Sequence, residues 1–151
     1  MRILIIEDDP NKLEQVRSLL VAEFADHIIE FAHSYQSGRA KLLATQPDVA
    51  VLDMQLPTFD KSPSEDGGRR RSFAGRDLLR QISRHNLKAA AVIVTQYQAF
   101  QEEQESLTLS ELKRELEGMK IPNYKGLIYY HPKLSNWKDE LVSIVHKSTA
   151  Q

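Results

Sequence analysis

Three consecutive acids, Glu7, Asp8 and Asp9, follow a short apolar run near the start of the chain, and the next basic residue is Lys12. Another acid, Asp53, ends a second apolar run, VAVLD. If folding brings Asp53 to the first acids, their charges repel unless a cation lies among them. Mg²⁺ binds carboxylate and carbonyl oxygens and keeps several waters. The acids therefore predict a site for a hard divalent cation, provided that the fold brings them together.

The elements that must position these acids alternate along the chain. Short apolar runs predict strands, and stretches with apolar residues at helical spacing predict helices. Thr108 and Glu111 form a capping box at the start of one of these helices. Strands that alternate with helices indicate a parallel sheet covered on both faces. The predicted strands are 2–6, 27–33, 48–53, 89–96 and 126–130, and the predicted helices are 10–24, 37–45, 75–85, 108–119 and 136–147.

Polar residues stand where these strands end. Ligands of an open parallel sheet bind at the carboxyl ends of its strands, near the point where the strand order reverses. The acids from Glu7 to Asp9 follow the first strand, Asp53 ends the third, Thr95 stands at the carboxyl end of the fourth and His131 follows the fifth. We expect these side chains to converge on one edge of the sheet.

Length and composition exclude several classes of protein. The chain has 151 residues, which predicts a single domain spanning 1–151. Its 20 Lys and Arg balance 21 Asp and Glu, so no nucleic-acid partner is expected. It has no cysteine and no amino-terminal segment typical of a signal peptide or a membrane span. We therefore expect a cytoplasmic protein that does not bind membranes.

The motifs ILIIEDDP, DVAVLDMQLP, GRDLLRQI, AVIVTQ and GLIYYHP, taken in this order, resemble the receiver domains of bacterial two-component response regulators. The resemblance implies a flavodoxin-like (βα)₅ fold, a three-layer sandwich with a five-stranded parallel sheet. It also implies that Asp53 is the phosphoacceptor and that Glu7 and Asp8 bind Mg²⁺ together with Asp53. The backbone carbonyl of Gln55 would complete the protein ligands, and Thr95 would be the switch hydroxyl.

The same resemblance implies a signalling function. Asp53 would take a phosphoryl group from a histidine kinase or a phosphotransfer protein, with Mg²⁺ as the cofactor. Because the chain ends after the fifth predicted helix, we expect a stand-alone receiver that signals by binding an unknown downstream protein. We do not expect an enzyme, beyond self-catalysed phosphorylation and slow autodephosphorylation.

The chain departs from the receiver pattern at its last strand and in two insertions. His131 stands where the family has a Lys beside the phosphoryl group, and Ile128 stands where it has a switch aromatic residue. The stretches 58–74 and 96–125 are longer than in the family. The first mixes Gly, Pro, Ser and charges of both signs, so we expect it to bury little apolar surface and to be mobile.

These departures leave an alternative function open. A pseudo-receiver would use the same fold as an interaction module that works without phosphorylation, and His131 and the insertions favour this hypothesis. A phosphatase of the haloacid dehalogenase type is disfavoured because it needs a second acid two residues after its nucleophile, where this chain has Gln55. A flavodoxin is disfavoured because the acids after the first strand would repel a bound phosphate.

Overall fold

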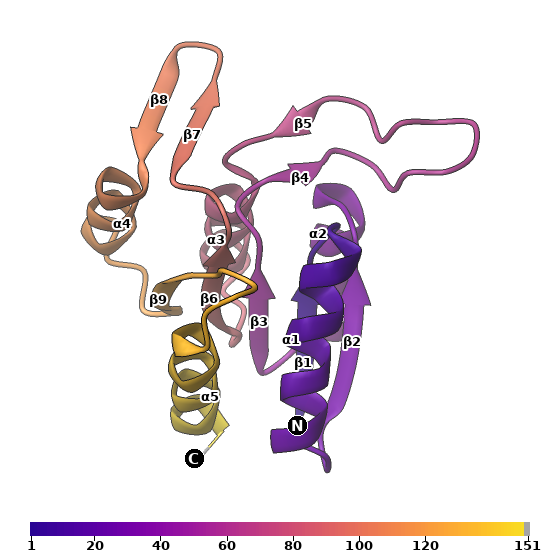
Figure 1. The fold of residues 1–151 in the computed structure, drawn as a ribbon, viewed down its shortest axis with the longest axis vertical. Coiled ribbons are helices and arrows are strands. Elements are labelled where there is room, and N and C mark those ends of the chain that lie inside the picture. Colours follow the sequence, from indigo (N-terminus) through magenta and orange to yellow (C-terminus); the bar gives the residue numbers. More distant parts are fainter. Residues whose placement is uncertain (150–151) are drawn as a thin grey trace.

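A five-stranded parallel sheet forms the centre of the protein in the computed structural model, which describes residues 1–149 (Figure 1). The strand order is β2-β1-β3-β6-β9, so the chain moves to one side of β1 first and then to the other. The predicted flavodoxin-like fold is confirmed, and the last two residues of the predicted 1–151 domain lie outside the described residues. The strands of the sheet are β1 (Arg2–Ile6), β2 (Ile28–Ala32), β3 (Val49–Leu52), β6 (Ala90–Thr95) and β9 (Tyr124–Tyr129).

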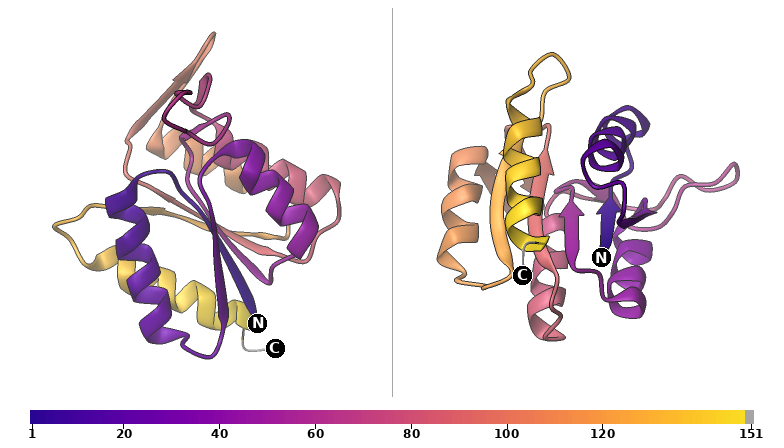
Figure 2. Two further views of the ribbon diagram at one scale, coloured as in Figure 1. Left: turned by 90° about the vertical axis from the view of Figure 1, so that its right-hand side faces the viewer. Right: turned by 90° about the horizontal axis from the view of Figure 1, so that it is seen from below.

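Helices cover both faces of this sheet (Figure 2). On one face lie α1 and α5, and on the other lie α2, α3 and α4. The predicted capping box of α4 is confirmed, since Thr108 and Glu111 exchange hydrogen bonds. The helices are α1 (Pro10–Glu23), α2 (Tyr35–Thr45), α3 (Ala74–Arg84), α4 (Leu109–Gly118) and α5 (Asn136–Thr149).

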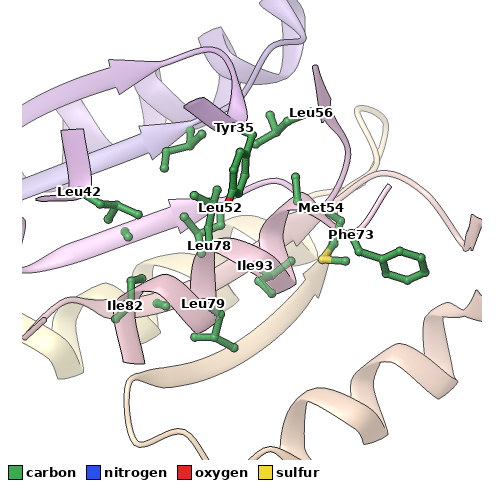
Figure 3. Packing of buried hydrophobic residues seen from close by; sticks show 14 of the residues in the cluster. Tyr35, Leu42, Leu52, Met54, Leu56, Phe73, Leu78, Leu79, Ile82 and Ile93 are labelled. Atoms are coloured by element: carbon green, nitrogen blue, oxygen red, sulfur yellow. The ribbon is translucent and has the colours of Figure 1, made fainter. Parts of the chain in front are cut away.

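The central strands are buried on both faces because their alternate side chains enter two separate cores. In β1, Ile3 and Ile5 pack in the core under α1 and α5, whereas Leu4 and Ile6 pack in the core under α2 and α3. Figure 3 shows the second core, where side chains from β3, α3 and β6 gather. Burial on both faces explains why these strands are apolar apart from Arg2 and Thr95, which lie at strand ends.

The two insertions form β ribbons beyond the carboxyl edge of the sheet (Figure 1). In the first, β4 (Leu56–Pro57) pairs with β5 (Arg70–Arg71), and in the second, β7 (Ala99–Glu102) pairs with β8 (Glu105–Thr108). These strands are not predicted from the sequence, because short ribbons at the surface carry little apolar periodicity.

The expectation that 58–74 buries little apolar surface was wrong at its carboxyl end. Phe73 is 2% exposed and packs against Phe100 of β7, with ring centroids 6.4 Å apart. Arg76 lies over Phe73 and donates three hydrogen bonds of 2.7 Å, two to Glu105 and one to Glu115. This buried arginine therefore joins α3 to both β8 and α4.

The described helices include none that is both long enough and apolar enough to span a bilayer.

Candidate functional site

The carboxyl ends of β1 and β3 bring Glu7 and Asp53 together. The two strands pair in register up to Ile6 and Leu52, and the amide of Asp53 donates to the carbonyl of Ile6 at 3.1 Å. Glu7 continues the alternation of Ile3 and Ile5, and Asp53 continues that of Val49 and Val51. This alternation places both acids on the face that α1 covers.

Both acids are buried, Glu7 with 3% and Asp53 with 2% of its surface exposed. Carboxylate oxygens of Glu7, Asp8 and Asp53 lie within 4.8 Å of one another, as the sequence predicted for a shared site. Burial, and then the charge of Asp53, raise the pKa of Glu7 to about 8, against the lowering effect of Lys12. Taking this carboxyl group out of water beside another acid favours its protonated form.

Lys12 is the cation that compensates these buried acids, and it was not predicted from the sequence as part of the site. Its Nζ lies 2.6 Å from Glu7 Oε1 and 3.2 Å from Asp53 Oδ1, and it donates to the carbonyl of Val94 at 2.6 Å. Burial opposes the charged form of Lys12, but Asp53 and Glu7 outweigh it and raise the pKa of Lys12. One signal was present in the sequence, since Lys12 precedes Val16 by four residues and lies on the same buried face of α1.

A second missed residue, Arg70, reaches the site from the first insertion. Its guanidinium donates to Asp8 Oδ2 at 3.0 Å and to the carbonyl of Gln55 at 3.3 Å. Lys61 lies 3.6 Å from the same oxygen of Asp8. Arg70 thus contacts two of the groups that were predicted to bind Mg²⁺. The run of three arginines gave no sign of which one would do so.

The donor set fits a magnesium ion. Asp8 Oδ1 is buried and has no hydrogen-bond partner among residues 1–149. Buried polar atoms nearly always have partners, so an unpaired carboxylate oxygen within a cluster of acids indicates a place for a cation. Glu7, Asp8, Asp53 and the carbonyl of Gln55 are the groups that would hold it.

Thr95 and His131 lie at the ends of the two neighbouring strands. Thr95 is buried directly after Val94, whose carbonyl binds Lys12, and its Oγ1 accepts from the amide of Tyr97 at 3.2 Å. His131 is half-buried, and its Nδ1 accepts from the amide of Lys133 at 3.1 Å. Among the interactions of the described residues, none joins His131 to the acids, so its expected contact with a phosphoryl group stays a prediction.

Sequence comparisons find relatives of this chain. No protein-family model matches the sequence. The chain is 30% identical over 142 residues to the uncharacterized protein y4jR of Sinorhizobium fredii, an alignment that covers 91% of this chain and 92% of that protein. It is 26% identical over 144 residues to the Detocs response regulatory protein DtcB of Enterobacter cloacae, covering 94% of this chain and 96% of DtcB.

Solved receiver domains have the same fold. A response regulator receiver domain from Clostridium thermocellum superposes with a TM-score of 0.65 at 18% identity, covering 99% of this chain and 94% of that one. The receiver domain of a sensor histidine kinase from Pseudomonas aeruginosa has a TM-score of 0.64 at 12% identity, covering 99% and 98%. That structure holds a magnesium ion in its active site cleft.

Proposed function

Because this chain has the fold of solved receiver domains and is similar to a response regulatory protein, we propose that it accepts a phosphoryl group on Asp53 and then signals by binding another protein. The observation that carries this proposal is the placement of Asp53. Its carboxylate lies at the end of a central strand, with Oδ1 bound by Lys12 and with Glu7 and Asp8 beside it. A histidine kinase or a phosphotransfer protein would be the donor, and Mg²⁺ the cofactor.

The proposed transfer uses one oxygen of Asp53 as the nucleophile. That oxygen forms a bond to phosphorus while the bond from phosphorus to the donor's leaving group breaks, and the electron pair departs with that group. With acetyl phosphate as the donor, the products are an acyl phosphate on Asp53 and free acetate. A magnesium ion held by Glu7, Asp8, Asp53 and Gln55 would neutralise charge on the incoming phosphoryl group.

The residues of the chain supply the remaining conditions. Lys12 holds Oδ1, and no described N–H or hydroxyl group donates to Oδ2, which leaves Oδ2 as the attacking oxygen. Thr95 Oγ1 accepts only the amide of Tyr97 among the described hydrogen bonds, so its own proton is available to a phosphoryl oxygen. The carbonyl of Val94 holds the side chain of Lys12 in place, and the amide of Tyr97 holds that of Thr95.

Intact mass measurement after incubation with acetyl phosphate and Mg²⁺ tests the proposal. We expect a mass increase of one phosphoryl group that disappears with a chelator and in Asp53→Asn. Asp48→Asn is the matched control, because Asp48 directly precedes β3 at the opposite end of the same strand. Failure of the wild type to gain the phosphoryl group, or a gain that persists in Asp53→Asn, would contradict the proposal.

One observation favours the pseudo-receiver as a second candidate. Lys12 and Arg70 already contact the three carboxylates, so protein cations alone compensate much of their charge. Such a site can persist without phosphorylation and can present a constant surface to a partner. In that case no donor would modify Asp53, and Asp53→Ala would leave partner binding unchanged.

A further inference from the structure

Lys12 is buried, which is unusual for a lysine. It is on the first turn of α1, and only 1% of its surface is exposed. Lysine is almost never buried to this extent unless its charge is paired. Its ammonium group therefore has a specific set of partners, and these partners indicate what it does.

The ammonium group has three oxygen partners, all of them within the site. Two are the carboxylates of Glu7 and Asp53, and the third is the carbonyl of Val94, at the end of β6. An ammonium group has three donors, so the number of partners matches its capacity. The ring of Tyr130 lies 5.9 Å away and covers another side of the ammonium group. Lys12 is thereby fixed against Asp53 from β1, β3 and β6 at once.

The other cations near the acids have a different placement. Of the three acids, Arg70 and Lys61 form an ion pair only with Asp8, and their side chains are 41% and 58% exposed. The ring of His131 turns to the amide of Lys133. Within residues 1–149, Lys12 is the one basic residue that forms an ion pair with Asp53.

We infer that Lys12, a residue of the first helix, is the protein cation that stabilises Asp53 and its negative charge during phosphoryl transfer, in place of a basic residue after the last strand. This inference rests on the proposed function. An attacking carboxylate and an incoming phosphoryl group are both negative, so a fixed positive charge at Asp53 lowers their repulsion. Because Lys12 binds Oδ1, it leaves Oδ2 as the oxygen that attacks.

The test compares initial rates of phosphorylation by acetyl phosphate and Mg²⁺ in Lys12→Met, His131→Ala and Val16→Ala. Lys12→Met keeps an unbranched side chain that is one atom shorter and removes its charge, and we expect a rate about a hundredfold lower, as for the loss of one preorganised donor. We expect a smaller loss for His131→Ala. Val16 lies one turn further along the same buried face of α1, so Val16→Ala controls for a general loss of stability.

Three outcomes among the variants overturn the inference. In the first, Lys12→Met is phosphorylated at the wild-type rate. In the second, His131→Ala loses more than Lys12→Met does. In the third, Val16→Ala and Lys12→Met have the same melting temperature and the same loss of rate. The loss would then come from reduced stability and not from the missing charge.

The outcome for the wild type separates this inference from the proposed function. A wild type that is never phosphorylated contradicts both, whereas a phosphorylated wild type that does not need Lys12 contradicts the inference alone. If Lys12→Met does not fold, the phosphorylation rate of His131→Ala still tests the inference. A rate about a hundredfold lower would show that His131, and not Lys12, supplies the positive charge. Retention of most of the rate supports Lys12.

Discussion

The guanidinium of Arg70 binds Asp8 across 62 residues of sequence, with Nη1 3.0 Å from Asp8 Oδ2. The same guanidinium donates to the carbonyl of Gln55 at 3.3 Å. Both partners belong to the predicted magnesium site. The inserted ribbon therefore places the positive charge of Arg70 beside the groups that would bind Mg²⁺. Arg70 and a metal ion would therefore compete for the same acid.

Replacing Arg70 should strengthen magnesium binding. We expect Arg70→Ala to bind Mg²⁺ up to about fivefold more tightly, because an exposed pair contributes up to about 1 kcal/mol. Titration of Mg²⁺ against the melting temperature measures this affinity. Arg69→Ala is the matched control, since Arg69 pairs with Glu102 and Glu103 instead. An unchanged or weaker response in Arg70→Ala would show that Arg70 does not compete with the metal.

Mg²⁺ itself should stabilise the protein. At about ten times its dissociation constant, a ligand that binds only the folded state adds about 1.4 kcal/mol, which raises the melting temperature by about 3–5 °C. Asp53→Asn should weaken this response, and Asp8→Asn should weaken it as well, since Asp8 Oδ1 has no partner among residues 1–149. Equal melting temperatures with millimolar Mg²⁺ and with a chelator would refute the metal site.

Stability without a metal should fall as pH rises. The pKa of Glu7 is raised to about 8, above the ordinary 4.5 of the unfolded chain, so the folded state binds more protons between these values. We expect the free energy of unfolding to decrease with a slope of up to about 1.4 kcal/mol per pH unit. Urea unfolding in chelator at about pH 5.5, 6.5 and 7.5 measures this slope.

Glu7→Gln should flatten this pH dependence, because it removes the group whose pKa differs between the two states. Glu14→Gln serves as the control, since the side chain of Glu14 is 63% exposed. Mg²⁺ should also flatten the slope by favouring the ionised carboxylate. If Glu7→Gln and the wild type have the same slope, the dependence comes from other groups and Glu7 is not the cause.

Gly75 at the start of α3 should tolerate no side chain. A Cβ there would lie 2.8 Å from the carbonyl oxygen of Asp53 and 2.9 Å from the sulfur of Met54. We expect Gly75→Ala to cost about 1–3 kcal/mol of stability and to slow phosphorylation, since it displaces the backbone of Asp53. Denaturant unfolding and the acetyl phosphate assay measure the two effects.

Gly118, the last residue of α4, is the matched control, because a Cβ there meets nothing within 4 Å. Gly118→Ala should leave phosphorylation unchanged and should be neutral or stabilise the protein by about 0.5–1 kcal/mol. Equal stability of Gly75→Ala and the wild type would mean that α3 shifts freely away from β3.

The sequence by itself determined the fold and the acids of the site. Apolar runs that alternate with amphipathic stretches dictate a parallel sheet, and the carboxyl ends of its strands must meet at one edge. Glu7 and Asp53 therefore converge regardless of how the loops run, and the structure places them as predicted.

Only the tertiary structure decided which cations meet these acids. Lys12 reaches Asp53 because α1 docks with this lysine on its buried face, and Arg70 reaches Asp8 because β5 pairs with β4. Helix docking and ribbon pairing depend on contacts between distant segments, which local periodicity does not encode. The spacing of Lys12 from Val16 is a local signal that this lysine lies on the buried face of α1. Nothing in the sequence distinguishes Arg70 from Arg69 or Arg71.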